Sequence, residues 1–256
     1  MRGKFSIISN VQRFLAGVID VEARGAAESC LMVVDGKPGL GKTRTMEWWA
    51  AQNGAVYLTA SPGWKDRVCY MLRELLQAAD PTIKPSRTEE KLVQQLRETL
   101  LFRNKAQRAQ GSVFGVVIDE AEVVVREKRL VETLRIKLSD ELEIPFVLVG
   151  MDGLRSDMAH TTPQGVSRVS RFIEFTPLTL EDAQQLVRDL CEVAVKDELV
   201  AYLHKATKGY IREIYNSLSR IEGYGKKNPG PVGLKEMRGQ VLFSDRAGKE
   251  VVVYGN

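Results

Sequence analysis

A glycine-rich segment at residues 36–43 limits the folds open to this chain more than any other part of it. The segment reads Gly-Lys-Pro-Gly-Leu-Gly-Lys-Thr, a full match to the pattern G-x-x-x-x-G-K-[ST]. A short apolar run precedes it at residues 31–34, and a helical pattern follows it. Glycines let a backbone wrap closely around phosphate groups and present N–H groups at the positive end of a helix. The segment therefore predicts a phosphate-binding loop between a buried strand and a helix.

The polar residues of this loop have distinct expected roles. Lys42 should neutralise the β- and γ-phosphates of a nucleotide, and the Thr43 hydroxyl should be a ligand of Mg²⁺. The other expected nucleotide contacts in and beside the loop are Gly36, Pro38, Gly39, Gly41 and Arg44.

A second apolar run ends in two acidic residues. Residues 116–121 read Val-Val-Ile-Asp-Glu-Ala. Asp119 is expected to join the Mg²⁺ shell, and Glu120 to polarise a water molecule for attack on the γ-phosphate. Alone, such a pair is as often the N-cap of a helix; with the phosphate loop upstream, it favours water as the acceptor. The sequence holds no Asn-Lys-x-Asp guanine-reading motif, so we expect ATP rather than GTP.

Short apolar runs alternate with helical patterns along the first two-thirds of the chain. Continuous runs of this kind indicate strands covered on both faces. The alternation predicts an α/β fold, in which helices flank a parallel five-stranded sheet. After the first, the runs lie at residues 55–58, 113–118, 146–149 and 172–175. The helical patterns lie at residues 9–22, 68–78, 89–102 and 129–138.

The pattern becomes helical after residue 177. Residues 179–182 match a capping box, and two more helices fit residues 197–206 and 211–221. Beyond a segment rich in Gly, Pro and Lys, two short apolar runs at residues 240–243 and 250–254 suit a hairpin. The expected domains are an α/β nucleotide-binding subdomain at 1–177, a helical lid at 178–222, and a linker with a tail at 223–256.

Composition excludes several classes of protein. The 256 residues are 44% hydrophobic and 27% charged, which is ordinary for a globular chain. No stretch approaches the roughly 20 apolar residues of a membrane span, and the first residues lack the apolar core of a signal peptide. We therefore expect no membrane partner and a location in the cytoplasm. Three separated cysteines and two histidines disfavour a disulfide scaffold, a zinc ribbon or a histidine metal site.

Three later segments carry a resemblance to a known family. They are Val-Leu-Val-Gly at residues 147–150, Ser-Arg-Val-Ser-Arg-Phe at 167–172 and Lys-Gly-Tyr-Ile-Arg-Glu-Ile at 208–214. With the phosphate loop and the acidic pair, they resemble the AAA+ ATPases, and within them the transposition-regulator branch that includes MuB and TnsC. In this family they correspond to the sensor-1 strand, the arginine-finger stretch and the start of the sensor-2 helix. The resemblance covers about residues 10–220.

The resemblance implies roles for individual residues. Arg168 or Arg171 is the candidate arginine finger, which would reach the nucleotide of a neighbouring subunit and make catalysis depend on an oligomer. Arg212 matches the sensor-2 arginine that faces the nucleotide. Asn10 and Val11 would line the adenine. For each arginine the alternative is a surface ion pair, and the sequence does not choose between the two fingers.

Two features depart from the family pattern. Met151, with Asp152 beside it, stands at the sensor-1 position, which is usually polar. A thioether cannot orient a water molecule by hydrogen bonding, so we expect slow hydrolysis that depends on DNA or a partner. MuB also carries an N-terminal helix-turn-helix domain, for which the residues before Asn10 leave no room. DNA binding would then come from the ATPase body.

Basic residues are concentrated between residues 61 and 110, where ten stand against six acidic ones. In the resembled family, the loop and helix after the second strand line the DNA, and Trp-Lys-Asp-Arg at residues 64–67 lies at the matching place. The expected phosphate contacts are Lys65 and Arg67, with a second group of Arg103, Lys105 and Arg108. The alternative is that these are exposed helix faces. The sequence has no base-reading motif, so binding to double-stranded DNA should be nonspecific.

The resemblance as a whole implies an ATP-dependent DNA-binding ATPase. With ATP bound, it would assemble on duplex DNA as a homo-oligomer or helical filament, recruit and stimulate a transposase, and so regulate target-site selection. Three alternatives remain. One is a nucleotide-gated DNA scaffold with little hydrolysis, suggested by Met151, and another is a helicase loader of similar build. The third, a small-molecule kinase, is disfavoured by Glu120 and by a helical lid that carries Arg212.

Overall fold

The computed structural model describes residues 1–23, 29–245 and 247–254 of the chain. These form two compact units. The α/β unit comprises residues 13–37 and 42–175, and the helical unit comprises residues 1–12, 38–41 and 176–256, apart from the positions that are not described. The expected division at residues 177 and 222 stays a prediction.

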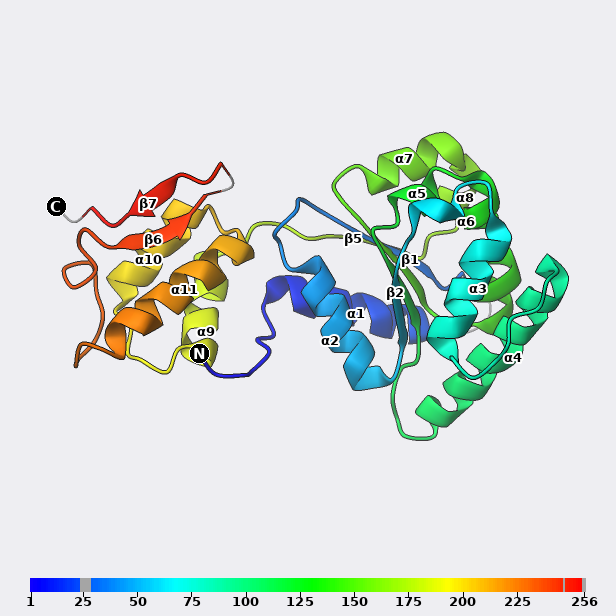
Figure 1. Ribbon diagram of the computed structural model, residues 1–256, viewed down its shortest axis with the longest axis horizontal. Helices are drawn as coiled ribbons and strands as arrows, with labels where there is room; N and C mark the ends of the chain where they lie inside the picture. Colours follow the sequence, from blue (N-terminus) through cyan, green and yellow to red (C-terminus); the bar gives the residue numbers. More distant parts are fainter. Residues whose placement is uncertain (24–28, 246, 255–256) are drawn as a thin grey trace. The chain divides into compact units, whose positions relative to one another are not determined.

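A parallel five-stranded sheet forms the centre of the α/β unit (Figure 1). The strand order is β2-β3-β4-β1-β5, so the chain crosses from β1 to the far edge before it returns. The expected α/β fold with helices flanking a five-stranded sheet is confirmed. The strands are β1 (Leu31–Asp35), β2 (Val56–Thr59), β3 (Val116–Asp119), β4 (Phe146–Val149) and β5 (Arg171–Glu174).

Helices cover both faces of this sheet (Figure 1). The part of α1 in this unit and α2 lie on one face, and α3, α4 and α6 lie on the other. The helical segments are α1 (Ser9–Ala23), α2 (Lys42–Asn53), the 3₁₀ turn η2 (Pro62–Trp64), α3 (Val68–Ala79), α4 (Glu89–Arg108), α5 (Glu122–Val125), α6 (Lys128–Leu134), the π-helical η3 (Arg135–Asp140), α7 (Leu154–Thr161) and α8 (Pro163–Val166).

The residues of β1 show why its apolar run is continuous. Leu31 and Val33 belong to the core cluster that α3, α4 and α6 share with the sheet. Met32 points the other way, toward Gly17 of α1, where an added Cβ would lie 3.3 Å from the Met32 Cε. Successive side chains of a strand point to opposite faces, so a strand buried on both sides needs an apolar residue at every position.

The helix predicted at residues 129–138 is wrong in detail. It starts at Lys128 as α6 and changes after Leu134 into the π-helical η3. The sequence also did not predict α5, α7 or α8, of which α5 and α8 are single turns of four residues. A single turn shows no helical period, so hydrophobic spacing cannot reveal it.

Besides the start of α1, the helical unit contains three helices and a two-stranded hairpin within its described residues. Thr179 caps the first helix, because its hydroxyl accepts the Asp182 N–H at 3.2 Å and its own N–H donates to the Asp182 carboxylate. The last helix continues to Gly225, into the segment expected to be a linker, and Val232 beyond it is buried. The elements are α9 (Leu180–Leu190), α10 (Asp197–Thr207), α11 (Ile211–Gly225), and antiparallel β6 (Val241–Ser244) and β7 (Glu250–Val252).

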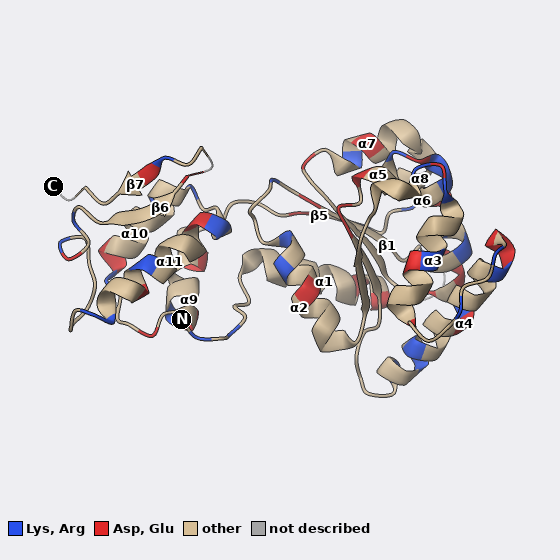
Figure 2. Ribbon diagram, in the orientation of Figure 1, with Lys and Arg blue, Asp and Glu red and all other residues tan. Residues whose placement is uncertain are grey.

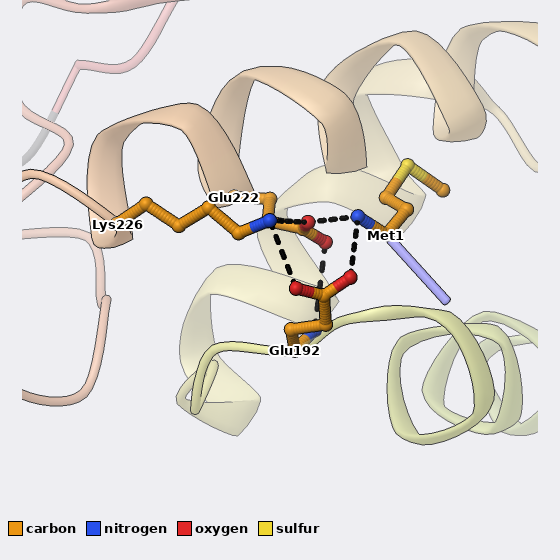
Figure 3. A network of polar contacts seen from close by, with 4 residues as sticks. All are labelled: Met1, Glu192, Glu222 and Lys226. Carbon is orange, nitrogen blue, oxygen red and sulfur yellow. Dashed lines mark hydrogen bonds and ion pairs between the residues drawn. The ribbon is translucent and has the colours of Figure 1, made fainter. Parts of the chain in front are cut away.

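An ion-pair network within the helical unit holds the first residues of the chain (Figure 3). The Met1 ammonium contacts Glu192 at 3.0 Å and also Glu222. The Lys226 ammonium lies 2.8 Å from Glu192 and 2.9 Å from Glu222. Hydrogen bonds from Lys226 and the chain's amino group lower the pKa of Glu192 to about 2. The two cations balance the charges of the two carboxylates, which offsets the free-energy cost of burying Glu222.

None of the helices in the described part of the chain has both the length and the apolar character that a bilayer crossing requires.

Candidate nucleotide site

The strand order brings three loops to one edge of the sheet. Strand β4 lies between β1 and β3, and all three are parallel, so their carboxyl ends meet. The loop after β4 is tied to both neighbours: the Gly150 N–H donates to the Val34 carbonyl at 3.0 Å, and the Ala121 N–H to the Val149 carbonyl at 2.8 Å. Ligands of open α/β sheets bind at this edge, where the strand order reverses.

Lys42 is the first residue of α2, and its side chain folds back over the phosphate loop. Its ammonium donates to the Gly36 carbonyl at 2.5 Å and to the Lys37 carbonyl at 3.0 Å. The residue is buried. Burial lowers the pKa of the Lys42 ammonium, and the charge of Asp119 at the end of β3 opposes this effect. A cation is thus held against the loop, near the carboxylate that ends β3.

Gly36 can be no other residue without strain. Its φ is +137°, and an added Cβ would lie 2.4 Å from the Phe175 carbonyl oxygen. The Phe175 N–H in turn donates to the Asp35 carbonyl at 2.8 Å, which fixes this backbone beside the start of the loop. Glycine is required here by conformation and by close backbone approach.

We expect Gly36→Ala to lower the free energy of unfolding by about 3 kcal/mol or more, because both the backbone conformation and the contact with a carbonyl are unfavourable. Gly111→Ala is the matched control. Gly111 also has a positive φ, of +74°, but no described heavy atom lies within 4 Å of its added Cβ. The free energy of unfolding of that variant should fall by only about 1 kcal/mol. Urea denaturation measures both, and equal losses would contradict the role of the Phe175 contact.

Asp119 ends β3 with both carboxylate oxygens engaged. One accepts the Glu120 N–H at 2.9 Å, and the other accepts the Tyr57 hydroxyl at 2.9 Å. Burial and the Asp119 charge raise the pKa of the Tyr57 phenol, so Tyr57 remains a donor. Sequence reasoning missed Tyr57. No sequence signal marks it, because Tyr57 reaches Asp119 only through the pairing of β2 with β3.

Glu120 has a left-handed backbone, with φ of +52°, and its side chain is exposed. A non-glycine residue in this region is unfavourable by about 1 kcal/mol or more, and such residues cluster at functional sites. The turn sends the Glu120 carboxylate into solvent at the sheet edge while Asp119 stays buried. The two acidic residues therefore occupy different environments, as different chemical roles require.

The donor set at this edge suits Mg²⁺. Thr43 offers a hydroxyl and Asp119 a carboxylate, and Mg²⁺ prefers oxygen ligands of this kind. Each Asp119 oxygen accepts one of the two hydrogen bonds described above and keeps a further lone pair. Among the described residues, no group of three or more acidic, His or Cys side chains could hold a metal ion. Mg²⁺ commonly uses only one or two protein ligands together with substrate phosphates.

The two candidate fingers have different surroundings. Arg171 lies on β5, and its guanidinium donates to Asp20 of α1 at 2.7 Å. Arg168 follows α8 and is exposed. Arg171 thus has an ion-pair partner within its own chain, and which of the two arginines is the finger stays a prediction.

Arg212 begins the contact between α11 and the tip of the phosphate loop, both within the helical unit. Its N–H donates to the Gly39 carbonyl at 3.2 Å. Gly41 also lies close to α11, since a Cβ added to it would lie 3.3 Å from the Ile211 side chain. The Arg212 side chain itself is exposed.

The remaining predicted nucleotide contacts differ in their exposure to solvent. Asn10 and Val11 are buried. The Asn10 amide donates to the Thr176 carbonyl at 2.9 Å and accepts the Thr176 N–H at 3.2 Å, so it fastens the chain where β5 leaves the sheet. Pro38 and Arg44 are exposed. A role for Asn10 and Val11 beside adenine stays a prediction.

Lys65 and Arg67 are exposed on either side of Asp66, between η2 and α3. The preceding Trp64 is fully buried, and its indole N–H donates to Glu74 at 2.8 Å, which anchors the turn.

Two arginines near this turn flank an exposed tyrosine. The guanidinium of Arg67 lies 5.3 Å from the centre of the Tyr70 ring, and that of Arg73 lies 5.9 Å from it. Arg67, Tyr70 and Arg73 thus form a small cationic and aromatic surface at the start of α3.

In the second predicted group of DNA contacts, two of the three side chains form hydrogen bonds within the chain. The Arg103 guanidinium donates to the Ala79 carbonyl at 2.7 Å and to the Gly54 carbonyl at 2.8 Å. It ties the end of α3 to α4 and is used within the fold. Arg108 donates to Asn104, and Lys105 is exposed. In Figure 2 both acidic and basic residues are coloured along α3 and α4.

Comparison with known proteins identifies the relatives of this arrangement. Residues 27–158, just over half of the chain, match the family model described as AAA domain. No curated protein matches the sequence.

Solved structures share the fold. The Aeropyrum pernix ORC2 protein in its ADP form is 14% identical, with a TM-score of 0.59 over 89% of this chain and 66% of that one. Cdc6p from Pyrobaculum aerophilum is 16% identical, with a TM-score of 0.59 over 89% of this chain and 64% of that one. The A. pernix ORC1 protein in complex with DNA is 14% identical, with a TM-score of 0.53 over 90% of this chain and 63% of that one. At these identities the likeness shows the fold alone, and the chain spans slightly less than two-thirds of these proteins. The resemblance to MuB and TnsC stays a prediction.

Proposed function

Because this chain belongs to the AAA domain family, we propose that it hydrolyses ATP with Mg²⁺ and couples the nucleotide state to binding of duplex DNA. One observation carries the enzymatic half of the proposal. The phosphate loop with its buried Lys42 and the Asp119–Glu120 pair lie at the same edge of the sheet. Their charges are close enough for Asp119 to act on the pKa of Lys42.

The residues divide the hydrolysis between them. Lys42 offsets charge on the β- and γ-phosphates, and Asp119, held by Tyr57, shares with Thr43 the ligation of Mg²⁺, which neutralises phosphate charge when bound. Glu120 accepts a proton as water attacks the γ-phosphate. Arg168 of a neighbouring subunit and Arg212 are the proposed cationic groups that stabilise the transferred phosphoryl group.

The DNA-binding half rests on the turn before α3. Lys65 and Arg67 supply exposed cations on a rigid anchor, and Tyr70 with Arg73 extends this surface. Phosphate contacts of this kind are independent of sequence, and repetition over the subunits of a filament would make binding steeply dependent on salt. Arg103 is left out because its hydrogen bonds lie within the fold.

The biological role follows the resemblance to the transposition regulators. In the proposed cycle, ATP-bound subunits assemble on DNA in the bacterial or phage-host cytoplasm and recruit a transposase. Hydrolysis then releases the DNA. A domain division into nucleotide-binding subdomain, helical lid and tail is part of this proposal.

The decisive test is nucleotide-dependent assembly. Purified protein is mixed with long duplex DNA and with ATP, ADP or no nucleotide, then sedimented and imaged. We expect filaments or rings on DNA with ATP alone. Equal sedimentation of DNA in all three conditions would overturn the nucleotide switch.

The second candidate function is a nucleotide-gated scaffold, favoured by the exposed thioether of Met151 at the end of β4. Phosphate release with DNA and a transposase present separates the two, since sustained turnover excludes the scaffold.

The basic turn makes a separate prediction. Lys65→Ala/Arg67→Ala should weaken DNA binding similarly for unrelated duplexes, because these side chains bind phosphates. The slope of log affinity against log salt should fall by about 0.9 for each phosphate that the variant no longer neutralises, measured over about 50 to 200 mM salt. Lys128→Ala removes an exposed cation from α6 and serves as control. An unchanged slope in the double variant would place the DNA-binding surface elsewhere.

A further inference from the structure

The first two residues after β4 carry no polar side chain, at the place that the family resemblance assigns to the sensor-1 group. This strand lies between β1, which leads into the phosphate loop, and β3, which ends at Asp119. Gly150 and Met151 follow the last residue of β4, and Met151 is 52% exposed. Neither residue offers a hydrogen-bonding group beyond the backbone.

A carboxylate from the neighbouring loop occupies this place. Glu122 is the first residue of α5, three positions after Asp119. One of its oxygens accepts the Met151 N–H at 2.6 Å. The absence of a side chain at Gly150 makes room for it, since an added Cβ there would lie 2.7 Å from the same oxygen. The Glu122 side chain therefore reaches across from β3 and rests against the end of β4.

Glu122 lies at the same edge of the sheet as the phosphate loop. The Met151 N–H that holds its carboxylate follows β4, the strand between β1, which leads into the phosphate loop, and β3, which ends at Asp119. With one oxygen fixed by the Met151 N–H, its second oxygen is left to accept another hydrogen bond.

We propose that Glu122 orients the attacking water and supplies the polar group that β4 itself lacks. This inference rests on the proposed ATPase activity. In the reaction, the water oxygen bonds to the γ-phosphorus while the bond from that phosphorus to the β–γ bridging oxygen breaks, releasing ADP and phosphate. Glu120 accepts the proton of the water, and Glu122 only accepts a hydrogen bond from it. The apolar Met151 is then compatible with turnover.

The first test removes or displaces the carboxylate. Glu122→Ala should lower kcat about 100-fold, because a misoriented water reacts slowly, with ATP affinity changed less than about threefold. Gly150→Ala should lower kcat about tenfold while Glu122 is still present, because the new methyl group pushes its carboxylate aside. Glu132→Ala, which removes an acidic side chain from α6, is the control. Thermal melting and ATP binding of every variant show whether each is folded.

The second test asks for rescue, which a purely structural role would not give. Met151→Asn added to Glu122→Ala places an amide at the end of β4 and should restore kcat about tenfold over Glu122→Ala alone. The proposal is overturned if wild-type protein hydrolyses ATP and Glu122→Ala stays within twofold of it, or if the added asparagine restores nothing. Lack of turnover by the wild-type protein, with DNA and partner present, would instead contradict the proposed ATPase.

Discussion

Lys42→Ala is expected to weaken ATP binding about a hundredfold and to remove measurable hydrolysis. The Lys42 ammonium is buried and is held by the Gly36 and Lys37 carbonyls, so it is already placed over the loop before any phosphate arrives. Loss of a buried, hydrogen-bonded charge that faces a ligand charge costs about 2–5 kcal/mol of binding, or roughly 30- to 4,000-fold. Titration with a fluorescent ATP analogue measures the affinity, and phosphate release measures the turnover.

Lys37→Ala is the control for this experiment, because Lys37 is an exposed cation in the same loop. It should change affinity less than about threefold, as expected for a solvated charge. The proposal also expects Lys42→Ala to lose ATP-dependent assembly on DNA. If Lys42→Ala bound ATP as the wild type does, the phosphate loop would not be the nucleotide site.

The sheet and the phosphate loop were predictable because both depend on local sequence. A strand covered on both faces needs an apolar residue at each position, and the run at residues 31–34 meets this requirement throughout. The loop requires glycine at fixed spacing, and Gly36 shows the reason, since the backbone of Phe175 occupies the space of a side chain. Such constraints act within a few residues and leave a pattern in the sequence.

Contacts between distant segments left no such pattern. The Tyr57 hydroxyl reaches Asp119 only because β2 pairs with β3, and the strand order was not known from the sequence. Arg171 is one of the two candidate fingers, and the hydrogen bond from its guanidinium to Asp20, 151 positions earlier, left no trace in the sequence. Arg103 was a predicted DNA contact, and its hydrogen bonds to two carbonyls of its own chain could not be read from the sequence. A long basic side chain can serve either purpose, and only its neighbours decide.

Glu122 shows the same limit within the candidate site. In the sequence it is one of three acidic residues in the run Asp-Glu-Ala-Glu at residues 119–122, with no mark that separates it from a helix N-terminus. Its link to Met151 depends on β4 lying beside β3. The family pattern drew attention to Met151 as a deficiency, whereas the fold brings a carboxylate to that place from the adjacent loop.

Glu120→Gln should lower ATP hydrolysis about 10²- to 10⁴-fold, the contribution typical of a general base. Glutamine keeps the size of the side chain and cannot accept the proton of the attacking water. The exposed position and left-handed turn of Glu120 place this side chain outside the core, so the fold and ATP affinity should be retained. Phosphate release under single-turnover conditions measures the loss, and ATP binding measured in parallel shows that the site is intact.

The consequence for DNA separates Glu120→Gln from Lys42→Ala. If hydrolysis is what releases DNA, Glu120→Gln with ATP should form complexes on duplex DNA that persist after dilution, whereas those of the wild type should decay as ATP is consumed. Complexes of the variant with ADP should be as weak as those of the wild type. Glu127→Gln, a change at the residue before α6, is the matched control and should behave as the wild type. Decay of the Glu120→Gln complexes at the wild-type rate would mean that DNA release does not wait for hydrolysis.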